Sequence, residues 1–127
     1  MRRHSDNSIA LAEALRATRG VKAVHHPLDS AIARRLMPDG AGGMMAFDLD
    51  GGRDAVQRMI SRFAMVTFAA SLGGVETTIS YPVITSHRSL SDEERAELGV
   101  GPGTVRVSVG IESADDIIED FVHAISS

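Results

Sequence analysis

Arg106 is the residue whose type and setting point most directly to chemistry. It stands in the alternating run 105–109, in which valine occupies every second position. In a strand, those valines would face a core, and Arg106 and Ser108 would lie on the opposite face. A planar guanidinium on a rigid strand suits bidentate capture of a carboxylate or phosphate. The structural alternative is an arginine paired with a nearby Asp or Glu.

A serine followed by a glycine-rich step forms a second candidate anion site. Ser71 precedes Leu72, Gly73 and Gly74. Its hydroxyl and the backbone N–H groups around Leu72 could hold an anion together. A glycine-rich serine loop is also a common structural turn, so this loop alone does not decide between the two interpretations.

Other reactive groups are sparse. Cysteine is absent, which excludes a disulfide framework and a thiolate nucleophile. None of the five histidines has the spacing of a zinc helix, so we expect no metal site. Lys22 is the single lysine, and a Schiff-base mechanism would have to use it. We interpret Lys22 as a surface residue.

Length and composition are those of one domain, residues 1–127. Of these residues 43% are hydrophobic and 24% are charged, enough for one core. A net charge of -4 with dispersed acidic residues argues against a nucleic-acid partner. No apolar run approaches membrane-spanning length and the start lacks an apolar signal stretch, so we expect a cytoplasmic protein without a membrane partner.

Periodicity predicts strands alternating with helices. Helices are expected from about Asp6 to Thr18, from Pro27 through Met37, around 56–63, after the capping box Ser91–Glu94, and after Ser113. The first helix has no clean cap at its start, so Arg2 and Arg3 could equally be helical. Strands are expected at 21–25, 44–49, 65–69, 76–81 and around Arg106, the third and fourth being two runs around a glycine kink. The Met44-Met45 pair falls on apolar positions and is interpreted as core.

These elements predict an α+β fold. Long crossovers do not separate every pair of strands, which favours a small, mostly antiparallel sheet over a doubly wound one. We expect about four strands with helices packed on one side.

Several segments together resemble the C-terminal part of a known enzyme family. They are Gly42-Gly43-Met44-Met45-Ala46-Phe47-Asp48-Leu49, Ser71-Leu72-Gly73-Gly74-Val75-Glu76, Tyr81-Pro82, Ser86-His87, Glu93-Glu94-Arg95, Leu98-Gly99-Val100 and Val105-Arg106-Val107-Ser108-Val109-Gly110-Ile111-Glu112. In order and spacing they are similar to the pyridoxal-phosphate enzymes of Cys/Met metabolism, which include cystathionine γ-synthase, cystathionine γ- and β-lyases, methionine γ-lyase and homoserine sulfhydrylases. The resemblance extends over nearly the whole chain.

The resemblance implies a substrate-binding role. In that family, of fold type I, the matching serine and arginine hold the α-carboxylate of an amino-acid substrate, which here assigns Ser71 and Arg106, with Leu72 beside them. The segment around Ser86 would lie near the active site. Ala70 stands where some γ-lyases carry glutamate, which puts a strict cystathionine γ-lyase assignment in doubt. The family member and its substrate stay open.

The resemblance also implies what must come from elsewhere. The family's cofactor lysine and its phosphate-binding residues lie in a large upstream domain that no segment here matches, so no pyridoxal phosphate is expected bound covalently to this chain. We expect the substrate-binding domain of an enzyme that eliminates or replaces a β- or γ-substituent, inactive alone and prone to self-association, since the family is homotetrameric. The alternative is a free-standing module that binds amino acids or a partner chain without catalysis.

Overall fold

The computed structural model describes residues 2–37, 40, 42–69, 74–82 and 89–126. Its elements in chain order are α1 (Arg2–Arg16), β1 (Val21–His25), the 3-10 helix η1 (Pro27–Asp29), α2 (Ala31–Leu36), β2 (Met44–Leu49), α3 (Gly52–Arg62), β3 (Thr67–Phe68), β4 (Thr78–Ser80), α4 (Asp92–Glu97), β5 (Thr104–Ser108) and α5 (Ala114–Ser126).

The strands form one sheet in the order β1-β2-β5-β4-β3. Every neighbouring pair is antiparallel except β3 with β4, which is parallel. The predicted α+β class and the mostly antiparallel sheet are confirmed. The strand count within the described residues is five rather than about four, because each of the five segments expected to be extended, the short β3 included, pairs into the sheet.

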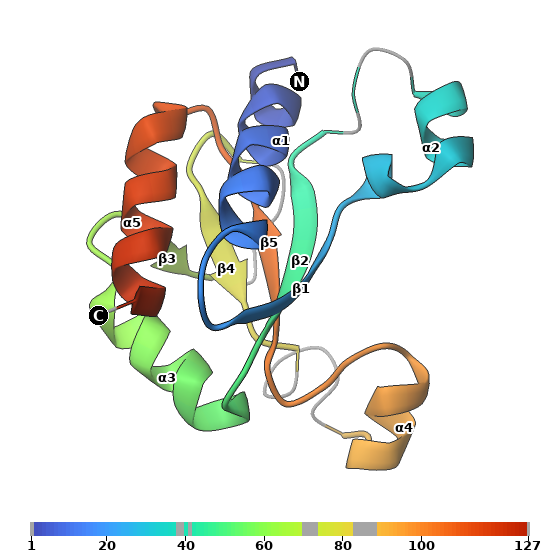
Figure 1. Cartoon of the computed structure of the whole chain (residues 1–127), viewed down its shortest axis with the longest axis vertical. Coiled ribbons are helices and arrows are strands. Elements are labelled where there is room, and N and C mark those ends of the chain that lie inside the picture. The colour runs from blue at the N-terminus through green and yellow to red at the C-terminus, as the bar shows by residue number, and fades with distance from the viewer. Residues whose placement is uncertain (1, 38–39, 41, 70–73, 83–88, 127) are drawn as a thin grey trace.

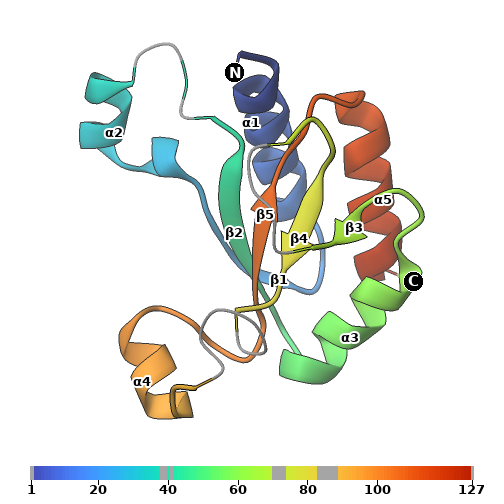
Figure 2. The same ribbon diagram turned by 180° about the vertical axis from the view of Figure 1, so that it is seen from behind.

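Three helices cover one face of the sheet. Figures 1 and 2 show α1, α3 and α5 together on this side, while α2 and α4 project at the two ends of the other side. We call the face opposite α1, α3 and α5 the open face. Helices therefore pack on one side, as predicted, and the open face is where a ligand could reach the strands.

Alternation along the central strands builds the core. Met45 and Phe47 of β2, and Val105 and Val107 of β5, are all buried on the helical side. The ring of Phe121 on α5 meets Phe47 edge-on, with ring centroids 6.0 Å apart, a favourable aromatic geometry. This packing makes β2 and β5 a rigid platform for the side chains on their other face.

Some predicted boundaries were wrong. The first helix begins at Arg2, the earlier of the two starts that the sequence left open, and ends at Arg16 rather than Thr18. The helix expected from Pro27 through Met37 is broken at Ser30, whose extended backbone separates η1 from α2. The strand expected at 65–69 is only two residues long, because its preceding turn is held by side-chain bonds to a distant helix rather than by strand pairing.

None of the described helices is both long and apolar enough to cross a membrane.

Candidate functional site

Arg106 lies at the centre of a row of residues that crosses four strands. It pairs with Ala46 of β2 on one side and with Ser80 of β4 on the other. Ala46 in turn pairs with His25 of β1. Directly paired residues in a sheet point to the same face, so His25, Ala46, Arg106 and Ser80 share the open face. The alternation in 105–109 thus predicted the side of Arg106 correctly.

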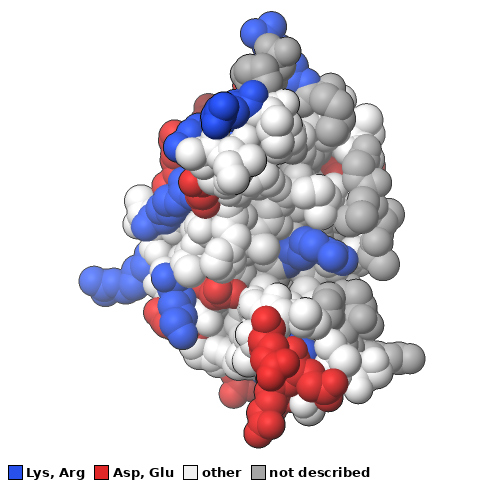
Figure 3. Space-filling model, turned by 90° about the vertical axis from the view of Figure 1, so that its right-hand side faces the viewer, with Lys and Arg blue, Asp and Glu red and all other residues white. Residues whose placement is uncertain are grey.

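The Arg106 guanidinium has no ion pair among the described residues. Its Nε is buried and makes no hydrogen bond there. The alternative that Arg106 pairs with an internal Asp or Glu therefore finds no support in this part of the chain. Leaving a buried donor unpaired is costly. Figure 3 shows a basic side chain near the middle of a largely uncharged face, with acidic groups gathered at the α4 end. An anionic ligand would satisfy the buried donor.

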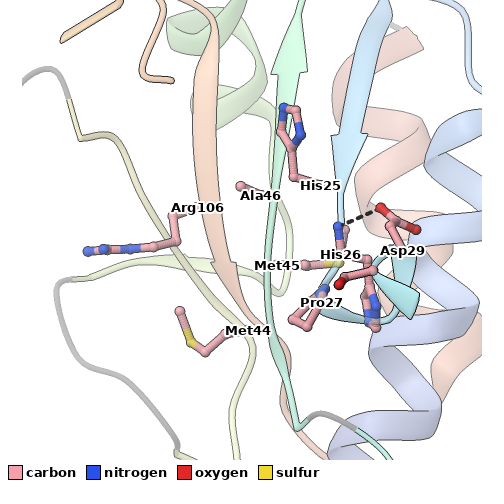
Figure 4. Close-up of a pocket in the computed structure, with 9 residues that line it drawn as sticks. His25, His26, Pro27, Asp29, Met44, Met45, Ala46 and Arg106 are labelled. Carbon is pink, nitrogen blue, oxygen red and sulfur yellow. Dashed lines mark hydrogen bonds between the residues drawn. The ribbon is translucent and has the colours of Figure 1, made fainter. Parts of the chain in front are cut away.

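A shallow, open hollow of about 650 Å³ lies beside Arg106. Its lining comes from β1, η1, β2 and β5, through His25, His26, Pro27, Asp29, Ser30, Met44, Met45, Ala46 and Arg106. Figure 4 shows Ala46 between Arg106 and His25, with the guanidinium extending away from β1. The small Ala46 side chain leaves room above the sheet. The volume falls in the range of small-molecule sites.

His25 is held at the far end of the row by a carboxylate. Its Nε2 lies 2.9 Å from Oδ2 of Asp48. The other oxygen of Asp48, Oδ1, accepts a hydrogen bond from the Thr104 hydroxyl at 2.5 Å. Thr104 Oγ1 itself accepts from the Gly101 N–H at 2.8 Å. This chain of bonds fixes the imidazole relative to β5 and to the turn that precedes it.

His26 holds in place the side of the hollow that η1 and its flanking residues form, which is called its wall below. Its Nδ1 accepts a hydrogen bond from the Leu28 N–H, and its Nε2 lies 2.9 Å from the Ser8 hydroxyl of α1. Burial lowers the pKa of His26, only partly opposed by the charge of Asp29. An Nδ1 that accepts from a backbone N–H must be unprotonated. His26 is therefore a neutral structural residue that docks η1 on α1.

Asp29 completes this wall as part of an ion pair. It accepts a hydrogen bond from the His26 backbone N–H and pairs with Arg16 at 2.6 Å. The bond to the His26 backbone is the main cause that lowers the pKa of the Asp29 carboxyl. Asp29 is thus ionised and already paired with a cation.

A polar network anchors the end of β5. Glu112 accepts from both the backbone N–H and the hydroxyl of Thr77, at 2.8 and 2.7 Å. Asn7 of α1 donates to the carbonyls of Gly110 and Glu112 at 3.0 and 2.8 Å. The Thr77 hydroxyl accepts from the Gly110 N–H at 3.0 Å. The network ties β5 to α1 and to the segment that leads into β4, and so holds Arg106 and Ser80 in register.

Three of the predicted site residues, Ser71, Leu72 and Ser86, lie outside the described residues. Ala69 is the last described residue before Ser71 and Leu72 in the sequence, and its N–H donates a hydrogen bond to the Ile79 carbonyl at 2.9 Å. Pro82, two residues after β4, is the last described residue before Ser86. The structure gives the position of Arg106 alone among the four, and the roles of all four residues stay proposals.

The neighbours of Arg106 in the hollow were not predicted from the sequence. Met44 was interpreted as core together with Met45, but only Met45 is buried, at 4% exposure, whereas Met44 is half-buried and shares the open face with Ala46. Strict alternation along 44–49 was the signal that could have assigned Met44, Ala46 and Asp48 to the face of Arg106. His25 could not be placed without knowing that β1 pairs with β2.

Comparison with known proteins identifies the family. The family model for the Cys/Met metabolism PLP-dependent enzymes matches residues 1–126. The chain belongs to this family. It spans about a third of the length of the curated relatives that it matches.

The relatives span several activities. The chain is 39% identical to the O-succinylhomoserine sulfhydrylase of Pseudomonas aeruginosa, covering all of this chain and 32% of that protein. It is 38% identical to the L-methionine gamma-lyase of Pseudomonas putida, covering all of this chain and 33% of that protein. The family is shown by these matches, but they do not select one reaction.

Solved structures confirm the fold. Cystathionine gamma synthase from Xanthomonas oryzae, in complex with aminoacrylate and cysteine, is 35% identical with a TM-score of 0.86, over 99% of this chain and 34% of that one. A Campylobacter jejuni structure that carries N′-pyridoxyl-lysine-5′-monophosphate is 29% identical with a TM-score of 0.88, over 98% and 31%. The family is pyridoxal-phosphate-dependent.

The described residues do not form a site for the cofactor. Pyridoxal phosphate acts through a Schiff base with a lysine, which needs a desolvated or otherwise depressed amine. Lys22, the single lysine, is exposed on the edge strand β1. It lines a smaller hollow of about 220 Å³ together with Asp48 and Asp50, away from the lining of the Arg106 hollow. We therefore derive no cofactor-dependent step from residues of this chain.

Proposed function

We propose that this chain is the C-terminal domain that binds the substrate α-carboxylate in a pyridoxal-phosphate enzyme of Cys/Met metabolism. Arg106 is the main carboxylate ligand, assisted by Ser71, the backbone at Leu72, and Ser86. The observation that carries the proposal is the guanidinium on the open face, with a buried Nε that lacks a partner among the described residues.

Electrostatics supports a carboxylate as the ligand. Two parallel N–H···O bonds from a guanidinium fix both the position and the orientation of a carboxylate. Arg106 is half-buried, so part of its charge is shielded from water and the bonds gain strength relative to those of an exposed arginine. Neighbours Ala46 and Ser80 carry no charge that would compete for it.

The rest of the catalytic apparatus is proposed to come from a large domain outside this sequence. The coverage of about a third of each relative supports this division. When bound there, pyridoxal phosphate supplies an electron sink for carbanion chemistry at the substrate Cα. The role of this chain is to hold and orient the substrate carboxylate, and we expect no turnover from this chain alone. Its partners would be that domain and further copies of the same protein.

Calorimetric titration of the chain with L-methionine and L-methioninol tests the proposal. The two ligands share the amine and the thioether, and only L-methionine carries the carboxylate. We expect L-methionine to bind about tenfold or more tightly, because a charge-assisted bidentate contact contributes roughly 1.5–3 kcal/mol. The preference should disappear in Arg106→Gln and persist in Arg58→Gln, which removes an exposed arginine of α3. Equal binding of both ligands by the unmodified chain would contradict the proposal.

A further inference from the structure

The hollow beside Arg106 has two unlike ends. Arg106 provides a cation at one end. At the other end, His25 Nε2 lies 2.9 Å from the Asp48 carboxylate. Ala46 lies between them (Figure 4), and the apolar side chain of Met44 also lines the hollow. A ligand that filled it would have a polar group at each end and an apolar middle.

The bonds of Asp48 determine what His25 can recognise. An ionised carboxylate only accepts hydrogen bonds, so the proton shared by this pair sits on His25 Nε2. In the neutral imidazole, Nδ1 then carries the lone pair and acts as an acceptor. Asp48 Oδ1 is occupied by the Thr104 hydroxyl, which fixes the carboxylate and, through it, the ring. Nδ1, which makes no hydrogen bond to any residue that the structure describes, favours a hydrogen-bond donor.

The charges at this end also favour a cation. Asp29, the carboxylate that lines the hollow, is paired with Arg16 at 2.6 Å and adds little net charge, so the charge at this end comes from Asp48 behind His25. Lys22, on the same strand as His25, makes no ion pair with Asp48. A neutral imidazole on an ionised Asp48 leaves one net negative charge, which attracts an ammonium and repels a second carboxylate.

Geometry sets the length of the ligand. Arg106 and His25 are separated by two interstrand spacings, roughly 10 Å, and the guanidinium extends further away from β1 (Figure 4). A thioether amino acid with seven bonds between its α-carboxyl carbon and a distal nitrogen spans about 9 Å, taking 3.8 Å for every three bonds. Adding a hydrogen bond of about 2.9 Å at each end lets such a ligand bridge the hollow.

We propose that His25, oriented by Asp48, is a specificity-determining residue that selects α-amino acids whose long apolar side chain ends in an ammonium group. This inference rests on the proposed function, because Arg106 must hold the α-carboxylate. The ligand lies with its carboxylate on Arg106, its thioether over Ala46, and its distal ammonium on His25 Nδ1.

Three ligands with one skeleton test this selection by calorimetric titration of the chain at about pH 8, where free imidazole is neutral. They are S-ethyl-L-homocysteine, S-(2-aminoethyl)-L-homocysteine and S-(2-carboxyethyl)-L-homocysteine, which differ only in the distal group. We expect the aminoethyl ligand to bind about tenfold more tightly than the ethyl ligand, and the carboxyethyl ligand to bind most weakly.

Two variants test whether His25 and Asp48 cause the preference for the aminoethyl ligand. His25→Phe removes the acceptor and Asp48→Asn removes the charge, and both should bring the aminoethyl and ethyl ligands to similar affinity. Asp50→Asn is the matched control, because it removes a carboxylate two positions away that lines the same smaller hollow as Asp48 but is not the hydrogen-bond partner of His25. Circular dichroism checks that each variant is folded. If a variant does not fold, the order of affinities of the three ligands for the unmodified chain decides whether a distal ammonium is preferred.

The outcomes separate this inference from the proposed function. If the three ligands bind equally and Arg106→Gln abolishes their binding, the selection by His25 is wrong and the carboxylate site stands. Tightest binding of the carboxyethyl ligand overturns the inference, because His25 would then act as a donor. Failure of all three ligands to bind overturns both.

Discussion

Replacement of Asp120 by alanine removes three hydrogen bonds that hold the turn between α3 and β3. The carboxylate of Asp120, buried on α5, accepts from the backbone N–H groups of Ala64, Met65 and Val66 at 2.9, 2.9 and 2.8 Å. The edge strand β3 follows at once and is only two residues long. Its position therefore depends on this side chain more than on its own pairing.

The magnitude follows from how deeply each N–H is buried. The hydrogen bond from the Val66 N–H to Asp120 is buried. Its loss leaves a donor that water cannot reach, which costs about 2–3 kcal/mol. The other two bonds are part-buried, and water can replace the carboxylate there at about 0.5–1 kcal/mol each. We expect Asp120→Ala to lower the free energy of unfolding by about 3–5 kcal/mol. Asp120→Asn keeps one acceptor oxygen and should lose about half as much.

Urea denaturation followed by far-UV circular dichroism measures the effect. The midpoint should fall while the slope m stays unchanged, because the surface exposed on unfolding is the same. Glu119→Ala is the matched control, since it removes an exposed carboxylate from the neighbouring position of α5 and should change the free energy by less than about 0.5 kcal/mol. A loss below about 1 kcal/mol in Asp120→Ala would refute the reasoning.

Three further predictions concern the supports of the site. Gly110→Ala should lower the free energy of unfolding by about 1–3 kcal/mol in the same assay, because the added Cβ would overlap the Val75 carbonyl oxygen; an unchanged midpoint would contradict this. Burial lowers the pKa of His26, so the unfolded chain takes up the proton first, and stability should decline as pH falls from about 6.5 to the lowered pKa. His26→Asn, which keeps an acceptor for the Leu28 N–H, should flatten that decline in denaturation series across pH, and an equal slope in both proteins would exclude His26 as its source. Ser91→Ala removes the side-chain cap of α4 and should cost about 1 kcal/mol, seen as faster amide exchange confined to α4; uniform protection would be the contrary result.

The local patterns that could be predicted from the sequence are those that depend on neighbouring residues. Alternation along 105–109 placed Arg106 on the face opposite the core, and the spacing of Ser91 and Glu94 predicted the capping box that the structure contains. Both signals lie within one element. They need no knowledge of which segments meet in the fold.

The parts that were missed depend on contacts between distant segments. The order of the strands puts Ala46 between His25 and Arg106, and nothing local to β1 or β2 specifies that pairing. Asp120 falls within a helix where only the apolar positions were used, and its three partners lie more than fifty residues earlier. Register and buried polar contacts are set by tertiary packing, so they became visible only in the structure.

The most direct test of the carboxylate site is the NMR signal of the Arg106 Nε–H in the ¹⁵N-labelled chain, assigned by comparison with Arg106→Lys. This donor is buried without a partner among the described residues, and a bound carboxylate would supply one. The account predicts a saturable shift of this signal on titration with L-methionine and none with L-methioninol. A chemical shift of the Arg106 Nε–H that changes with neither ligand, or that changes equally with both, would contradict the assignment of Arg106 as the carboxylate ligand.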